Sequence, residues 1–171
     1  FFASTNAQIK ERISGYIKDL AEFKDEKLKI DLLELYTLVN YTSSCGIPAT
    51  MDMLYFYFGD LIENYEDIIY ALKKMNKIIV ETTDEELKID ESQDYLIMRS
   101  KLFAEKSIFL IPPEIFAHVL EKFLDKVSPH AIYRYDIFKR KAYDADFTRR
   151  AFSKTRGIQF YEKLLLQNSN P

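Results

Sequence analysis

The chain of 171 residues has few of the side chains from which catalytic and metal sites are built. Cys45 is its only cysteine, which excludes an internal disulfide and a thiolate metal cluster. Next to Gly46, such a thiol is more often a small buried residue than a nucleophile. The two histidines, His118 and His130, lie on either side of a proline and have no acidic motif of metal-binding spacing beside them. We therefore expect no metal site here.

Three widespread functional motifs are absent from the sequence. It has neither the G-x-x-x-x-G-K-[ST] loop nor the G-x-G-x-x-G turn that cradle phosphates, and it lacks the G-x-S-x-G elbow of hydrolases. We expect a non-catalytic chain that holds no cofactor of its own.

Long apolar runs and secretion signals are missing as well. No run reaches the roughly 18 to 20 residues that span a bilayer, and no signal-peptide pattern is visible. We expect a cytoplasmic protein without a membrane partner. The chain starts at Phe1 without an initiator Met and stops at Pro171 without a closing element, so we expect an excised domain of a longer protein.

What is present indicates a mostly helical protein, because only four Gly and five Pro interrupt long periodic stretches. Apolar residues every three or four positions, with caps and breakers between them, predict helices over residues 7–23, 27–41, 51–58, 64–76, 99–110, 113–127 and 158–166. Gly157 is expected to separate the last helix from the segment before it. Short runs rich in β-branched or alternating residues predict strands at 77–83, 87–90 and from 95.

The periodicity also predicts which side chains face the core. For the helix over 64–76 the expected buried stripe is Tyr65, Ile68, Ile69, Leu72 and Met75. For the helix over 99–110 it is Leu102, Phe103, Phe109 and the stem of Lys106. For the last helix it is Tyr161, Leu164 and Leu165.

The order helix, short helix, helix and β-hairpin predicts a winged helix, with residues 77–109 forming the wing and the helix after it. We expect a linker helix from a preceding domain over 1–26, a winged-helix domain over 27–110 and a helical extension over 111–171.

A winged helix suggests DNA binding, but the charges argue against it. The helix over 64–76 would enter the major groove, yet its front carries Glu63, Glu66 and Asp67, which repel phosphate. The predicted wing turn, Asp84 to Glu86, is acidic too. We therefore favour a packing role for this helix within a larger protein.

The basic residues are concentrated near the end of the chain. The net charge is −3, but residues 134–156 hold eight Lys or Arg against three acids. Aromatic residues interleave with these cations, a pattern that binds single-stranded nucleic acid or an acidic partner. Alternatively the aromatics are core, and the cations are solvated or paired. The candidate nucleic-acid-binding residues are Arg134, Lys139, Arg140, Lys141, Arg149, Arg150, Lys154 and Arg156.

Residues 95–105, YLIMRSKLFAE, resemble the winged-helix region of STAND-class signalling ATPases, the bacterial NACHT-like and NB-ARC-like proteins. The resemblance continues through 141–144, 150–152 and 160–164, which look like the connector to tetratricopeptide-type repeats. It implies a regulatory domain of an ATPase in signalling or antiviral defence. The implied partners are an upstream nucleotide-binding domain and downstream helical repeats of the same chain.

In that family a His at the end of the wing approaches the phosphates of ATP or ADP bound to the parent protein. Arg99 and Ser100 stand at that place here, and neither is His. Since an arginine meets phosphate through charge-assisted hydrogen bonds, Arg99 is the hypothesised sensor. The alternative is that Arg99 pairs with a nearby carboxylate such as Glu105.

Overall fold

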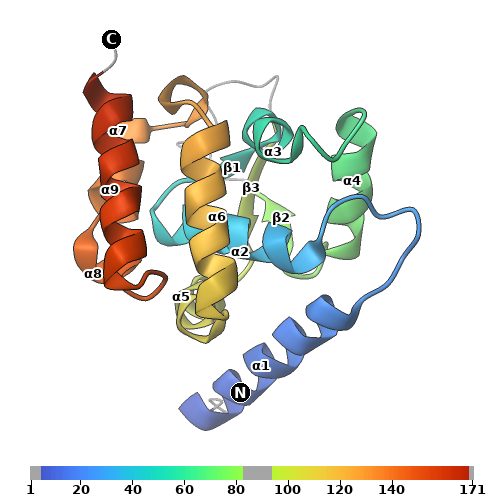
Figure 1. Ribbon diagram of the computed structural model, residues 1–171. Helices are drawn as coiled ribbons and strands as arrows, with labels where there is room; N and C mark the ends of the chain where they lie inside the picture. The colour runs from blue at the N-terminus through green and yellow to red at the C-terminus, as the bar shows by residue number, and fades with distance from the viewer. Residues whose placement is uncertain (1–4, 83–93, 170–171) are drawn as a thin grey trace.

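The computed structural model describes residues 5–82 and 94–169. This part of the chain is mainly α-helical with one small antiparallel sheet, as the sequence predicts (Figure 1). Its elements are, in chain order, α1 (Asn6–Glu22), α2 (Leu32–Ser44), β1 (Ala49–Thr50), α3 (Met51–Phe58), α4 (Tyr65–Lys74), β2 (Ile79–Glu81), β3 (Tyr95–Met98), α5 (Lys101–Leu110), α6 (Pro113–Lys126), the 3-10 helix η1 (Pro129–Ala131), α7 (Tyr135–Ala142), α8 (Ala145–Thr148) and α9 (Lys154–Ser169).

Side-chain caps fix where several helices begin. Thr50 accepts a hydrogen bond from the Met53 amide at the start of α3, and Asn64 accepts one from the Glu66 amide at the start of α4. The prediction that a helix begins at 27 is wrong. Asp25 instead holds a turn by accepting from the Lys27 amide, and α2 starts only after its cap, Asp31.

The last helix is longer than predicted, because Gly157 does not interrupt it. α9 begins at Lys154, and the Gly157 amide donates to the Ser153 carbonyl at 2.8 Å. A glycine inside a helix costs about 1 kcal/mol, which the burial of Phe160 and Leu164 on the same helix offsets.

The sheet has the order β1-β3-β2, and both pairs are antiparallel. Ala49 lies opposite Leu96, and Ile79 lies opposite Met98. β3 is therefore the central strand, which pairs with β1 before α3 and with β2 after α4. The predicted strand over 87–90 and the acidic turn at 84–86 lie outside the described residues.

One hydrophobic core contains buried residues from helices α1 to α9 and from all three strands. At its centre the Tyr41 ring of α2 packs edge-on against Phe123 of α6 and Phe138 of α7, with centroids 5.5 and 5.4 Å apart. It also stacks on Phe147 of α8 at 6.0 Å. The segment predicted as an extension is thus packed against α2.

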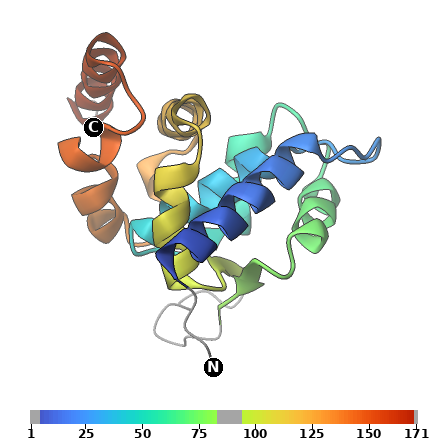
Figure 2. The same ribbon diagram turned by 90° about the horizontal axis from the view of Figure 1, so that it is seen from below.

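The first helix, predicted as a linker, packs on α2 and α5 (Figure 2). Ile13, Ile17 and Leu20 are buried, and the Tyr16 ring lies 5.3 Å from that of Tyr36. α1 therefore covers one side of the core.

Some side chains expected in the core lie on the surface. Leu102 and Phe109 of α5 are exposed. The buried residues of this helix are Ala104, Ser107 and Ile108, because α5 packs against α1 and α2. Tyr65 and Ile69 of α4 and Leu165 of α9 were also expected in the core, and they too are exposed.

Candidate functional site

Arg99, the hypothesised phosphate sensor, lies at the exposed end of β3. Its amide donates to the Ile78 carbonyl at 2.7 Å, and its guanidinium donates through Nη2 to the Asn76 carbonyl at 3.2 Å. Within residues 5–82 and 94–169 it forms no ion pair with Glu105 or another carboxylate. Its contact to one exposed carbonyl leaves most of the guanidinium donors facing solvent.

Ser100, the residue after Arg99, stabilises the start of α5. Its Oγ accepts a hydrogen bond from the Phe103 amide at 3.1 Å, and its carbonyl accepts one from the Ala104 amide at 3.0 Å. Ser100 is therefore the N-cap of α5. Of the two residues, only Arg99 presents several donors to solvent.

Two of the eight basic residues of the C-terminal segment are held in ion pairs. Arg156 is held by α6, where its Nε donates to Glu121 at 3.1 Å and its Nη1 lies 3.5 Å from Glu114. Arg149 pairs with Asp146 at 3.4 Å. Phe138 and Phe147, two of the interleaved aromatics, are buried in the core. The residues that point to solvent are Lys139, Arg140, Lys141, Arg149, Arg150 and Lys154.

Two of the candidate nucleic-acid-binding residues, Lys141 and Arg150, lie in the wall of the same cavity. They line a cavity of about 370 Å³ between α5, α7 and α8. The Arg150 guanidinium lies over the exposed ring of Phe109, 3.5 Å from its centroid. Burial, and then the charge of Arg149, lower the pKa of Arg150. The acids Glu105, Asp144 and Asp146 line the same cavity, so it holds both signs of charge.

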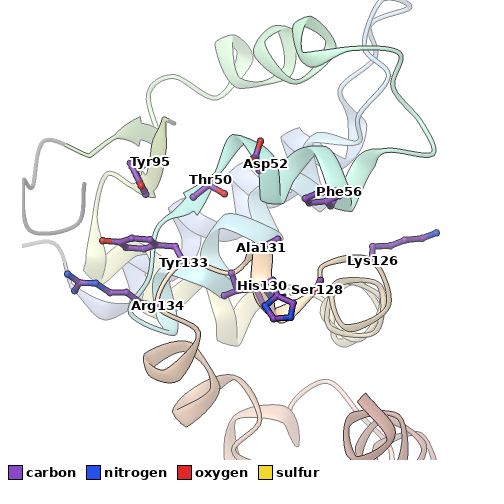
Figure 3. A pocket seen from close by; sticks show the side chains of 11 residues that line it. Thr50, Asp52, Phe56, Tyr95, Lys126, Ser128, His130, Ala131, Tyr133 and Arg134 are labelled. Carbon is purple, nitrogen blue, oxygen red and sulfur yellow. Dashed lines mark hydrogen bonds between the residues drawn. The ribbon is translucent and has the colours of Figure 1, made fainter. Parts of the chain in front are cut away.

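Arg134 lies apart from these, at the start of α7. Its backbone is left-handed, with φ 49° and ψ 54°, and its guanidinium lies 5.4 Å from the centroid of the Tyr133 ring. It borders a cavity of about 770 Å³ between the start of α3, β3 and the segment after α6 (Figure 3).

That cavity is lined by five apolar or aromatic residues and by six polar or charged ones, which are Thr50, Asp52, Lys126, Ser128, His130 and Arg134. Tyr95 and Tyr133 meet edge-on with centroids 5.1 Å apart, and Phe56, Ala131 and Ile132 complete much of the wall. Such a composition suits an apolar group that enters with a polar neighbour. No pattern in the sequence indicates this cavity, because its walls come from segments that are far apart in the chain.

The same cavity opens beside an exposed aromatic surface on α3 and α4. Tyr55 of α3 stacks on Tyr65 of α4, with centroids 4.8 Å apart, and the Tyr65 hydroxyl donates to Asp52 at 3.0 Å. Ile69 follows one turn after Tyr65. Phe56, Tyr65 and Ile69 are 50%, 43% and 42% exposed. We call these three residues, with Tyr55 and Asp52, the α3–α4 strip.

Acidic residues predominate in the segment that carries the strip. Residues 51–72 contain five acids and no Lys, Arg or His; the acids are Asp52, Asp60, Glu63, Glu66 and Asp67. Cations from outside this segment already pair with three of them. Lys29 lies 3.3 Å from Glu63 and 3.9 Å from Asp67, and Lys126 lies 2.9 Å from Asp60. The acids of this segment disfavour phosphate, and three of them are already neutralised by lysines of the same chain.

The remaining candidates have structural surroundings. Cys45 is buried, which raises the pKa of its thiol above the usual value and keeps it protonated. His118 contacts Glu34, and His130 borders the large cavity. In the described ranges no three His, Cys, Asp or Glu side chains converge as they would around a metal ion.

None of the described helices combines the length and the apolar character that crossing a bilayer requires. Comparisons of the chain with protein-family models, with curated proteins and with solved structures found no match.

Proposed function

We propose that this chain is a winged-helix regulatory module, non-catalytic and cytoplasmic, which docks on the nucleotide-binding domain of a larger STAND-like ATPase in signalling or antiviral defence. The order α2, β1, α3, α4, β2, β3 and the sheet order β1-β3-β2 support the winged-helix assignment. If the chain is a winged helix, α4 is the counterpart of the DNA-recognition helix.

The observation that carries the regulatory proposal is the chemistry of the α3–α4 strip. A helix that reads DNA offers cations or amides to phosphates and base edges. The exposed front of α4 instead offers Tyr65, Glu66 and Ile69. An apolar surface rimmed by acids suits another protein surface.

Arg99 supplies the link to nucleotide state in this proposal. The parent's nucleotide-binding domain would hold ATP or ADP, and the donors of Arg99 would meet its phosphates through charge-assisted hydrogen bonds when the module is docked. The docked state then depends on the nucleotide, and release of the module toward the helical repeats relays that state.

Nucleotide retention by the full-length protein tests this proposal. We expect Arg99→Ala to lower the fraction of protein purified with bound ADP at least several-fold, and Arg99→Lys to lower it less. Lys101→Ala is the matched control, since Lys101 is an exposed cation two residues away. Equal retention by wild type and Arg99→Ala, measured by chromatography of the extracted nucleotide, would contradict the sensor role.

The second candidate function is binding of nucleic acid by the basic segment. The juxtaposition of Lys141 and Arg150, with Arg150 stacked on Phe109, favours it. Fluorescence anisotropy with labelled single- and double-stranded DNA, across a salt series, tests it on this chain. Micromolar binding that weakens steeply with salt and is lost in Arg149→Glu/Arg150→Glu would support it. Absence of binding at low salt would reject it.

A further inference from the structure

We infer that the cavity between α5, α7 and α8 binds a small zwitterion, of which an α-amino acid with an apolar side chain is the simplest example. We call it the α5–α8 cavity. This ligand goes beyond the proposed function and does not depend on it, since every group that would hold it lies within this chain.

Charged side chains of both signs line the α5–α8 cavity without pairing. Glu105 belongs to α5, Lys141 belongs to α7, and Arg150 follows α8. In residues 5–82 and 94–169 none of these three side chains forms an ion pair. Unlike charges attract one another, so their separation here leaves room that a molecule carrying both signs can bridge.

The other two acids of the cavity already have partners. Asp144 caps α8, since its Oδ1 accepts hydrogen bonds from the amides of Asp146 and Phe147 at 2.9 and 3.2 Å. Asp146 lies 3.4 Å from Nη2 of Arg149. Glu105 is therefore the carboxylate of the cavity that is left, within the described ranges, to accept hydrogen bonds from an ammonium group.

Aromatic rings lie next to both cations of the cavity. The Arg150 guanidinium lies 3.5 Å from the centroid of the Phe109 ring, and the Lys141 ammonium lies 5.5 Å from that of Phe147. Ile108 of α5 adds an aliphatic side chain to the lining. A ligand whose carboxylate meets Lys141 and Arg150 would therefore have its apolar side chain beside these groups.

The size of the cavity and an unpartnered hydroxyl fit such a ligand. The volume of about 370 Å³ is at the lower end of the range of small-molecule sites. Ser44 also lines the cavity, and its hydroxyl oxygen is enclosed without a hydrogen-bond partner in the part of the chain that the structure describes. A carboxylate oxygen of the ligand can accept a hydrogen bond from this hydroxyl.

A ligand with charge of one sign fits this lining less well. An anion alone would leave Glu105 without a partner, and a cation alone would leave Lys141 and Arg150 without one. The phosphates of a nucleic acid strand would meet all three acids of the cavity. The pairing of both signs with an apolar wall therefore selects a zwitterion.

NMR titration of the ¹⁵N-labelled chain tests this site with three probes of matched shape. L-phenylalanine carries both charges, 2-phenylethylamine lacks the carboxylate, and 3-phenylpropionate lacks the ammonium. We expect L-phenylalanine to shift the amide signals of residues around the cavity in a saturable way. Each analogue should bind at least tenfold more weakly, because it leaves one sign of charge in the cavity without a partner.

Variants connect the binding to the cavity. Glu105→Gln and Lys141→Met should each weaken the binding of L-phenylalanine at least fivefold. Glu162→Gln and Lys163→Met are the matched controls, since both residues are exposed on α9 and do not line the cavity, and they should leave the affinity unchanged. Thermal unfolding verifies that all four variants are folded.

Three results would overturn the zwitterion site. One is the absence of saturable shifts up to about 10 mM L-phenylalanine, where a ligand with a Kd of about 1 mM would be roughly nine-tenths bound. Another is binding of either analogue as tightly as L-phenylalanine, or unchanged affinity in Glu105→Gln and Lys141→Met. The third is a shift of the same amides by single-stranded DNA but not by L-phenylalanine, which would assign the cavity to the second candidate function.

Discussion

Lys122 of α6 places its ammonium 3.3 Å from Oε1 of Glu34 in α2, although the two residues are 88 positions apart. The same oxygen accepts a hydrogen bond from the Tyr57 hydroxyl of α3 at 2.8 Å and lies 3.0 Å from Nε2 of His118. Only 13% of the Glu34 side chain and 16% of the Lys122 side chain are exposed. One carboxylate thus ties α2, α3 and α6 together.

Removing this carboxylate should destabilise the fold more than removing a surface acid. We expect Glu34→Ala to lower the free energy of unfolding by about 3 kcal/mol, because Lys122 and Tyr57 lose their shared partner while still buried. Urea unfolding measures the effect. Glu63→Ala is the control, with an expected loss below about 1 kcal/mol, since the Glu63–Lys29 pair is exposed. Equal losses in both variants would contradict the buried network.

The aromatic centre of the core gives a second prediction. Phe138→Ala should lower the free energy of unfolding by about 3 to 5 kcal/mol, because Phe138 is fully buried against Tyr41 and Phe123. Leu165→Ala, at a side chain that is 69% exposed, should change it by less than about 0.5 kcal/mol. Denaturant titration of both variants is the measurement. A small loss for Phe138→Ala would show that α7 is not packed on α2.

Ser100 allows a structural role to be separated from a role in phosphate binding. Ser100→Ala should lower the free energy of unfolding by about 1 kcal/mol, because α5 loses its N-cap. Ser100→Asp keeps a capping oxygen and should restore stability, while its charge repels a nearby phosphate. We therefore expect Ser100→Asp to be stable but to retain less nucleotide in the full-length protein. Retention equal to wild type would place Ser100 away from the phosphates.

A pH dependence follows from Asp25. Its carboxylate accepts hydrogen bonds from the Tyr70 hydroxyl at 2.6 Å and from the Lys27 amide at 2.9 Å. These bonds, and then Lys74, hold the pKa of Asp25 below its ordinary value of 3.8. A lowered pKa in the folded state adds stability that is complete well above 3.8 and is lost as the pH falls through the folded-state pKa.

Asp25→Asn should therefore be less stable than wild type at neutral pH, and the difference should shrink as the pH is taken below 3.8. Melting temperatures of both proteins across this range provide the measurement. Asp19→Asn is a control on α1, and its difference from wild type should be small at every pH. A difference for Asp25→Asn that grows toward low pH would have the wrong sign.

Features that depend on neighbouring residues were predictable from the sequence. Thr50 and Asn64 are followed by apolar residues of helical period, and α3 and α4 begin where these caps stand. The strand that begins at Tyr95 was predicted from β-rich residues between polar turns and is confirmed. The start of α2 was misjudged because helical periodicity extends back past the Asp25 turn, whose hydrogen bonds periodicity does not report.

The candidate site was predictable only in part. The sequence predicts acidic side chains on the front of α4, and these acids are exposed in the structure. The exposure of Tyr65 and Ile69 was missed, since an apolar residue at helical spacing is normally assigned to the core. The cavity beside Phe56 was also missed, because it needs α3, β3 and residues 128–134 to meet.

By itself the sequence determined the helical class, the caps and the uneven distribution of charge, because these arise from interactions within a few residues. Only the tertiary structure decided which faces are buried, which cations are paired and where the cavity lies. Arg156 illustrates this division: it stands among the basic residues of the C-terminal segment, yet the packing of α9 against α6 commits it to Glu121. Such pairings depend on distances between elements, and these are set by how a shared core is filled.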